Sequence, residues 1–176
     1  MIVYFLRHVS AGQPKITPKQ DEHRSIDKIG EQQSHDVGCA LAALGVKVDA
    51  LISSPLTRAV QTAELTAKEF GHKDKLVIDE AMRPEASFDQ FHDLLTHYAT
   101  SKAIMVVGHN PSITEFLVHL LTGSDSSDCI YLKKGAVAKV EVEENKAVLQ
   151  WMLTPKMASK LQAGSARSSR PKTSRK

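Results

Sequence analysis

The sequence predicts an α/β fold: a three-layer sandwich with a mostly parallel central sheet, a C-terminal antiparallel hairpin and helices on both faces. Three observations predict it. Short apolar runs alternate with stretches of helical periodicity as far as Gly123, which is the pattern of parallel βαβ units. These runs are continuously apolar, as strands covered on both faces are. Beyond Gly123, apolar and polar residues alternate on either side of a polar turn, which is typical of a hairpin.

The first predicted strand is the apolar run IVYFL, residues 2–6. Residues 9–25 have no periodicity and contain glycine and prolines, so they predict a long loop. A loop of this length in a compact domain is often functional. A helix is then expected over residues 27–44, with Asp27 as its N-cap and Gly45 at its end.

Residues 49–53 (DALIS) predict the second buried strand. The pair Ser54-Pro55 behind it predicts a helix that begins with a serine cap and has proline at its first position. Residues 75–79 (KLVID) predict a third strand, which an irregular stretch follows. These segments predict that strands and helices alternate through the first half of the chain.

Ser87 and Gln90 predict a capping box at the start of the third long helix. The run AIMVVG, residues 103–108, predicts the fourth strand, and its apolar character places it at the centre of the sheet. Asn110-Pro111 then repeats the cap-and-proline start of a helix. The segments AVAKVEVE and AVLQWML predict the two strands of the terminal hairpin.

One domain is expected at residues 1–160, because the chain of 176 residues is 41% hydrophobic and long enough for one core. Residues 161–176 are expected to form a basic, disordered tail. The last fourteen residues hold five lysines and arginines and no acid, so the net charge of +3 leaves the remainder at about −2. Such a body is not a nucleic-acid-binding module, whereas the tail is either a solvated end or a weak attachment site for an anionic partner.

The sequence favours a cytoplasmic protein. Its two cysteines, Cys39 and Cys129, are too few for a disulfide framework and fit a reducing compartment. No apolar run reaches the length of a membrane helix, so no membrane contact is expected. The apolar start is also too short for the core of a signal peptide, and Arg7 follows it directly.

Basic side chains follow three of the predicted strands, at the end where this fold class binds ligands. Arg7 and His8 come after the first strand, Arg58 lies in the first turn of the helix after the second, and His109 follows the fourth. Each is individually unremarkable at a strand end or a turn, and an arginine is unfavourable beside a helix N-terminus. Together they predict an anion-binding rim, to which helix N-termini add N–H donors.

The motifs LRHVSAG, SSPLTRAVQTAE and VGHNPS resemble the three signatures of the histidine phosphatase superfamily, the phosphoglycerate-mutase-like group. The short length and the spacing resemble its small SixA-type branch, the phosphohistidine phosphatases. The resemblance covers residues 1 to about 155. It implies that His8 is the phosphorylated nucleophile, that Arg7 and Arg58 hold the phosphate and that His109 is the second histidine of the pocket.

The resemblance also implies a phosphate or substrate contact at Arg24, for which the alternative is a solvated loop arginine. Asn110 in VGHNPS joins the substrate-binding candidates. The chemistry of these side chains suits the implied roles. Neutral imidazole is a competent nucleophile near pH 7, and a guanidinium group binds phosphate oxygens in bidentate fashion. No metal or other cofactor is expected, since the remaining histidines form no metal-binding motif.

Two positions depart from the family pattern. Val9 stands where the usual Arg-His-Gly has glycine, and a β-branched residue adopts left-handed backbone angles only at a cost, so a different loop geometry is expected. Pro84 stands where larger members carry a general acid, which makes the adjacent Glu85 the general-acid candidate, its alternative being an ordinary loop residue. A weak acid favours phosphohistidine, because an alkoxide needs a proton to leave whereas solvent can protonate imidazole. It also argues against mutase activity on sugar phosphates.

The expected function is that of a hydrolase: a metal-free phosphatase that works through a phosphohistidine intermediate and acts on a phosphohistidine protein. Two alternatives stay open. One is a small-molecule phosphomonoesterase, and the other is a phosphate-binding module with weak turnover. The presence of the nucleophile together with its phosphate clamps weighs against the last.

Overall fold

The structure is a computed structural model, and it describes residues 1–124, 130–143 and 146–168. The first half contains β1 (Ile2–Arg7), α1 (Pro18–Glu22), α2 (Lys28–Ala43), β2 (Ala50–Ser53), α3 (Thr57–Phe70) and β3 (Val77–Ile78). A short 3₁₀ helix (Glu80–Met82) leads into α4 (Phe88–His97), β4 (Ala103–Gly108), α5 (Ser112–Thr122), β5 (Val137–Glu143), β6 (Lys146–Leu153) and α6 (Pro155–Ser168).

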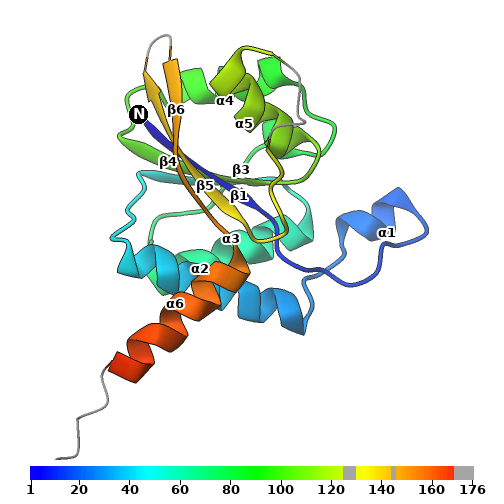
Figure 1. The fold of residues 1–176 in the computed structure, drawn as a ribbon. Coiled ribbons are helices and arrows are strands. Elements are labelled where there is room, and N and C mark those ends of the chain that lie inside the picture. The colour runs from blue at the N-terminus through cyan, green and yellow to red at the C-terminus, as the bar shows by residue number, and fades with distance from the viewer. Residues whose placement is uncertain (125–129, 144–145, 169–176) are drawn as a thin grey trace, which may run out of the picture.

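The six strands form one sheet in the order β3-β2-β4-β1-β5-β6. Strand β4 pairs in parallel with both β1 and β2, which confirms its predicted central position. Strands β5 and β6 form the antiparallel hairpin, and β5 continues the sheet alongside β1. Helices α2, α3 and α6 cover one face and α4 and α5 the other, so the predicted three-layer sandwich is confirmed (Figure 1).

The alternation of side chains along β1 divides the core into two clusters. Phe5 faces the layer of α4 and α5, where its ring packs against Phe91 at a centroid distance of 5.6 Å. Leu6 faces the opposite layer and packs with Leu41 and Met105. Because successive strand residues point to opposite faces, a strand with both faces covered must be apolar throughout. This is the pattern that the predicted strands show.

The helix starts after β2 and β4 differ from the prediction. The N-cap of α3 is Leu56 rather than Ser54, and that of α5 is Pro111 rather than Asn110. The Ser54 hydroxyl accepts at 3.4 Å from the N–H of Leu56, which lies before the first turn of α3, and both predicted caps also have partners distant in sequence. The Ser54 hydroxyl is 2.9 Å from Nε2 of His109, and the Asn110 amide nitrogen donates to a carbonyl of residue 132 at 3.2 Å.

Other local predictions hold. Asp27 caps α2 by accepting from the N–H of Gly30, and Ser87 with Gln90 forms the predicted capping box of α4. The prediction of a loop over residues 9–25 is wrong in one respect, because this segment contains the short helix α1. None of the residues in α1 is buried, so it has no apolar periodicity for a sequence pattern to show.

The C-terminal helix α6 was not predicted, and it continues to Ser168, eight residues into the segment expected to be disordered. It packs on α2, where Ala158 is buried and the Gln162 side chain donates to the carbonyl of Asp36. The rest of the expected tail, residues 169–176, lies outside the described residues, as does Cys129. Within the described part of the chain, no helix combines the length and apolar character needed to cross a membrane.

Candidate active site

The parallel pairing of β1 with β4 brings the first and last motifs together. Arg7 lies opposite Gly108 in the register, so the residues that follow, His8 and His109, leave the sheet side by side. The N–H of His8 donates to the carbonyl of Gly108 at 3.0 Å. Strand β2 ends at the same edge, and its pairing with β4 places Arg58, in the first turn of α3, on the same rim.

A cavity of about 390 Å³ lies at this edge, and we call it the anion cavity. It contains six of the seven predicted site residues: Arg7, His8, Arg24, Arg58, His109 and Asn110. Its other lining residues are Ser10, Ala11, Gly12, Gln13, Pro14, Asp27, Pro84 and Lys134. The sequence-distant motifs and the irregular 9–25 segment therefore converge on one site.

The two histidines are the central feature of the anion cavity. Their ring centroids are 5.0 Å apart, and both residues are buried, with 6% of His8 and 2% of His109 exposed. Nδ1 of His8 is 2.7 Å from the carbonyl oxygen of Val9. Because a carbonyl only accepts, Nδ1 carries the proton in this contact, and Nε2 of neutral His8 keeps its lone pair. The backbone thus sets the tautomer that a nucleophile requires.

Burial and neighbouring cations keep both rings neutral. Burial lowers the pKa of His8 from 6.5 to about 3, with the charges of Arg58 and Arg7 acting in the same direction. Burial lowers the pKa of His109 to about 2, again with help from His8 and the arginines. Since each ring loses solvation and meets positive charge, its cationic form is disfavoured unless an anion enters the cavity.

Backbone carbonyls and one carboxylate hold the arginines in place. Nη1 of Arg7 donates to the carbonyl of Leu132 at 2.8 Å, and Nη1 of Arg58 donates to the carbonyl of Asp21 at 2.9 Å. The Asp21 carboxylate is 3.3 Å from Nη1 of Arg58 and 2.7 Å from Nε of Arg24. This acid offsets the unfavourable position of Arg58 at a helix N-terminus.

Several polar atoms of the site have no partner among the described residues. They are Nε of Arg7, Nε of Arg58 and Nδ1 of His109, each buried. Buried donors without partners are costly, and native structures retain them chiefly where function requires it. Two guanidinium groups and an imidazole with unused hydrogen-bonding capacity are well suited to a tetrahedral oxyanion.

Val9 fits its position without the backbone angles expected to cause difficulty. Among the described residues, positive φ values occur only at glycines, so Val9 is not in the left-handed region. Its N–H donates to the Thr62 hydroxyl at 3.2 Å, and its side chain is fully buried. A Cβ at Gly30 would lie 2.9 Å from one Val9 methyl group, and a Cβ at Gly135 would lie 3.2 Å from the other. The two glycines therefore make room for valine.

Glu85 is the predicted site residue that the anion cavity does not include. Its side chain is 69% exposed, and its carboxylate lies 3.8 Å from Nη1 of Arg83. Arg83 is also paired with Glu80 and, at 2.9 Å, with Glu22. Pro84 lines the cavity in its place. The carboxylate is thus part of a surface ion-pair group rather than of the cavity lining.

The structure adds three residues that the sequence analysis did not select. Lys134 lines the cavity, Asp21 holds two of its arginines, and the Ser54 hydroxyl contacts His109. Lys134 comes just before β5, and because β5 is antiparallel to β1, its start lies at the rim where β1 ends. A search of residues that precede an antiparallel strand, as well as those that follow parallel strands, would have found it.

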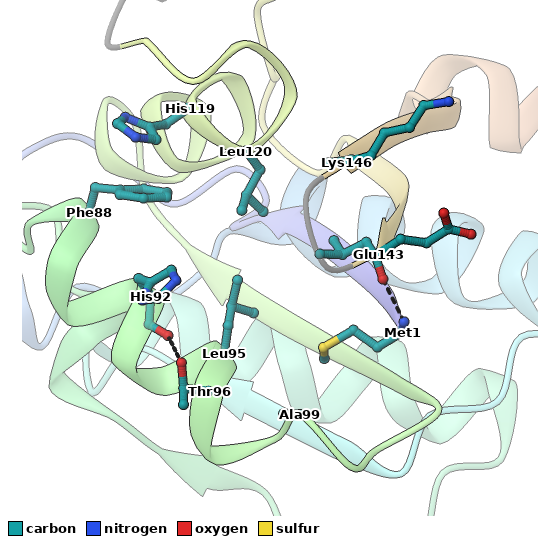
Figure 2. Close-up of a pocket in the computed structure, with 12 residues that line it drawn as sticks. Met1, Phe88, His92, Leu95, Thr96, Ala99, His119, Leu120, Glu143 and Lys146 are labelled. Carbon is teal, nitrogen blue, oxygen red and sulfur yellow. Dashed lines mark hydrogen bonds between the residues drawn. The ribbon is translucent and has the colours of Figure 1, made fainter.

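A larger cavity, of about 660 Å³, lies at the opposite end of β1, and we call it the apolar groove. Met1, the ends of β5 and β6, and helices α4 and α5 line it (Figure 2). The ring of His119 stacks on Phe88 at a centroid distance of 3.7 Å, while Leu95 and Leu120 contribute apolar surface. None of the predicted site residues lines this groove.

The comparisons with known proteins agree with the motifs. The family model of the histidine phosphatase superfamily (branch 1) matches residues 3–97, which include the first two motifs. An uncharacterised protein of Picosynechococcus is 29% identical over 140 residues, covering 78% of this chain and 82% of that protein. The mitochondrial serine/threonine-protein phosphatase PGAM5 of Rattus norvegicus is 29% identical over 66 residues, which are 38% of this chain and 22% of that protein.

Solved structures share the fold over most of the chain. The protein histidine phosphatase SixA complexed with tungstate has a TM-score of 0.79 at 19% identity, covering 89% of this chain and 98% of that one. A phosphohistidine phosphatase SixA candidate from Agrobacterium tumefaciens has a TM-score of 0.74 at 22% identity, with 88% and 97% covered. With the family model matching more than half of the chain, this protein belongs to the histidine phosphatase superfamily (branch 1) and is a phosphatase of that family.

Proposed function

We propose that the protein is a metal-free phosphatase that forms a phosphohistidine intermediate at His8 and acts on phosphohistidine in a protein. The observation that carries the proposal is the buried His8 ring, whose Nδ1 is bound to the Val9 carbonyl at 2.7 Å and whose neighbours are three arginines and His109. A neutral imidazole with a fixed tautomer beside several cations combines a nucleophile with an anion site.

In the first half-reaction, the Nε2 lone pair of His8 forms a bond to phosphorus as the bond from phosphorus to the leaving group breaks. Arg7 and Arg58 bind the equatorial oxygens, where charge is stabilised during the transfer. The buried Nδ1 of His109 has no partner among the described residues and adds a hydrogen bond to the anion when protonated. The cations thereby supply the charge that a metal ion supplies in other phosphatases.

In the second half-reaction, water attacks the phosphorus of phospho-His8 and releases inorganic phosphate. The N–P bond breaks and its electron pair returns to Nε2, so the starting tautomer is restored. Splitting the displacement in two keeps the leaving group and the attacking water in the same place at different times. One cavity of about 390 Å³ can therefore serve both steps.

The choice of phosphohistidine rests on the leaving group. A departing alkoxide needs a general acid, and the Glu85 carboxylate lies among surface ion pairs rather than in the cavity lining. A departing imidazole takes its proton from water. The likeness of the fold to SixA proteins supports the same choice. The second candidate, a phosphomonoesterase, is favoured by the likeness to a phosphoserine phosphatase of Entamoeba histolytica at a TM-score of 0.65.

A substrate panel in the presence of EDTA tests the proposal. The panel contains a phosphohistidine peptide, a phosphoserine peptide, p-nitrophenyl phosphate and a sugar phosphate. We expect the highest kcat/KM for the phosphohistidine peptide, and acid-labile, base-stable label on His8 after quenching. A preference for phosphoserine or the sugar phosphate would establish the second candidate. Activity that disappears with EDTA and returns with a divalent ion, while circular dichroism shows that the fold is retained, would exclude the metal-free mechanism.

A further inference from the structure

Three metal-ligating side chains lie together between α2 and α3, away from the anion cavity. His35 and Cys39 lie one turn apart on α2, and Glu69 comes from α3. Nδ1 of His35 is 3.2 Å from Oε1 of Glu69, and Sγ of Cys39 is 3.6 Å from Oε2 of Glu69. The two α2 side chains are in contact as well, with 3.9 Å between Nδ1 and Sγ. One donor atom from each residue lies within 4.8 Å of the others.

These separations are close to those around a tetrahedral zinc ion. With Zn–S near 2.3 Å and Zn–N and Zn–O near 2.0 Å, the donor atoms of such a site are about 3.3–3.6 Å apart. The distances are 3.2 Å from Nδ1 of His35 to Oε1 of Glu69, 3.6 Å from Sγ of Cys39 to Oε2 of Glu69, and 3.9 Å from Sγ to Nδ1. They lie close to this range, and because the first two end on different oxygens of the carboxylate, the side chains must shift to bring one donor atom each onto an ion. A thiolate, an imidazole and a carboxylate form a donor set that suits Zn²⁺ and does not suit Mg²⁺ or Ca²⁺.

The backbone contact between α2 and α3 holds the cluster in place. A Cβ at Gly38 would lie 2.5 Å from Cβ of Glu69 and 2.7 Å from the carbonyl oxygen of Thr66. No larger residue fits there, so glycine allows the helices to approach until the stem of Glu69 lies against α2. Cys39, the neighbour of Gly38, and His35, one turn earlier, are thereby presented to the carboxylate before any ion arrives.

The cluster is open to solvent on one side. The His35 side chain is 51% exposed and that of Glu69 is 29% exposed. A small cavity of about 240 Å³ adjoins them, lined also by Glu31, Leu65 and Lys68. It gives an ion a route of entry and leaves space for water as a fourth ligand. Lys68 opposes a cation there, but its long side chain can turn its ammonium group to solvent.

We propose that His35, Cys39 and Glu69 bind one Zn²⁺ ion and so fasten α2 to α3. Binding replaces the thiol S–H bond by an S–Zn bond and releases the proton to solvent. The ion takes no part in phosphoryl transfer, because Asp27 at the start of α2 lines the anion cavity while Cys39 lies about 18 Å further along that helix. The inference is therefore independent of the proposed function.

Co²⁺ serves as the spectroscopic probe, because a thiolate ligand gives a charge-transfer band and tetrahedral coordination gives visible bands. The full chain carries Cys129→Ser, so that Cys39 supplies the thiolate, and is freed of metal with a chelator. We expect one equivalent of Co²⁺ to produce both bands, and Zn²⁺ to displace it and to raise the melting temperature. Cys39→Ser should abolish the charge-transfer band. His35→Gln and Glu69→Gln should weaken Zn²⁺ binding by about tenfold or more, at least the effect of losing an outer-shell partner.

His97→Gln is the matched control, because His97 is an exposed helical histidine on the opposite face of the sheet. It should bind Zn²⁺ as the parent does. Circular dichroism of each variant shows that the fold is retained, so that loss of binding is not loss of structure. The proposal is overturned by absence of the charge-transfer band in the Cys129→Ser parent. It is equally overturned if His35→Gln and Glu69→Gln bind Zn²⁺ with the parent's affinity.

Discussion

The anion cavity and the apolar groove lie at opposite ends of β1, and both contain two histidines. In the anion cavity, His8 and His109 are buried among arginines held by backbone carbonyls. In the apolar groove, His119 is half-buried against Phe88 and His92 is exposed. The groove is the larger of the two, at about 660 Å³ against 390 Å³. Neither histidine content nor size distinguishes a reactive site. What distinguishes the anion cavity from the apolar groove is its fixed guanidinium groups with unpartnered nitrogens.

The largest expected difference between the two regions is the effect of removing one histidine. His8→Ala should lower kcat/KM on a phosphohistidine peptide by roughly a thousandfold or more, as loss of a covalent nucleophile does. His92→Ala, in the apolar groove, should change it by less than about twofold, because a surface side chain outside the site contributes little. Steady-state kinetics of both variants make the measurement. A His8→Ala enzyme that keeps most of its activity would remove the basis of the mechanism.

The pH profile tests the electrostatic side of the comparison. An ordinary histidine with a pKa of 6.5 is only about 3% neutral at pH 5. Burial lowers the pKa of His8 to about 3, so the ring of the free enzyme stays neutral there. Acidification therefore removes the nucleophile only well below pH 5, and kcat/KM should fall by less than about twofold between pH 7 and pH 5, instead of the roughly 25-fold fall expected for a pKa of 6.5.

Because kcat/KM follows the ionisation of the free enzyme, the profile needs correction for the substrate's own phosphate ionisation. Circular dichroism at each pH separates loss of activity from unfolding. An acid limb with a midpoint near pH 6.5 would contradict the prediction. It would mean that the His8 ring is more accessible to water than its 6% exposure indicates, or that negative charge lies close to it.

The fold was predictable because its signal is local and repeated. Each central strand is apolar throughout, and each of the helices α2 to α5 ends at a glycine or begins at a capping residue. The layers formed by these elements, though not the strand order, therefore follow from the sequence. Helix α1 was missed because it buries nothing, and α6 because Ala158 is the one residue it buries among those whose side chains the structure describes. The caps at Ser54 and Asn110 were wrong because their side chains contact residues distant in sequence. A pattern within one segment carries no information about such partners.

The candidate site likewise contains residues that can be predicted from the sequence and residues that cannot. Residues that directly follow parallel strands, such as His8 and His109, can be grouped from sequence because the carboxyl ends of those strands share an edge. Lys134 and Asp21 cannot be grouped with the site in this way. The place of Lys134 depends on the position of β5 in the sheet, and that of Asp21 depends on the unpredicted helix α1. The cluster of His35 and Cys39 with Glu69 likewise requires the packing of two helices.

Two lysines, one in each region, provide a smaller and matched test. Lys134 lines the anion cavity and Lys146 lines the apolar groove. Lys134→Gln should raise KM for a phosphorylated substrate by up to about fivefold, the effect of losing an exposed charge interaction of up to 1 kcal/mol. The increase should shrink at high salt, because screening weakens exposed charges. Lys146→Gln should leave KM unchanged. Equal effects of the two variants would show that overall charge, rather than the cavity, attracts the substrate.

The smallest expected effect concerns Glu85, and it separates the two substrate classes. Its carboxylate is 69% exposed and 3.8 Å from Arg83, so Glu85→Gln should change phosphohistidine hydrolysis by less than about twofold. On an alkyl phosphate, a working general acid would be worth roughly a hundredfold or more. Rates of Glu85→Gln on a phosphohistidine peptide and on an alkyl phosphate, with Glu80→Gln as the control at the same arginine, make the comparison. A selective loss on the alkyl phosphate would show that the carboxylate reaches the cavity during turnover and would favour the phosphomonoesterase. Large and equal losses on both substrates would assign Glu85 to positioning through Arg83, and the leaving-group argument for phosphohistidine would then fail.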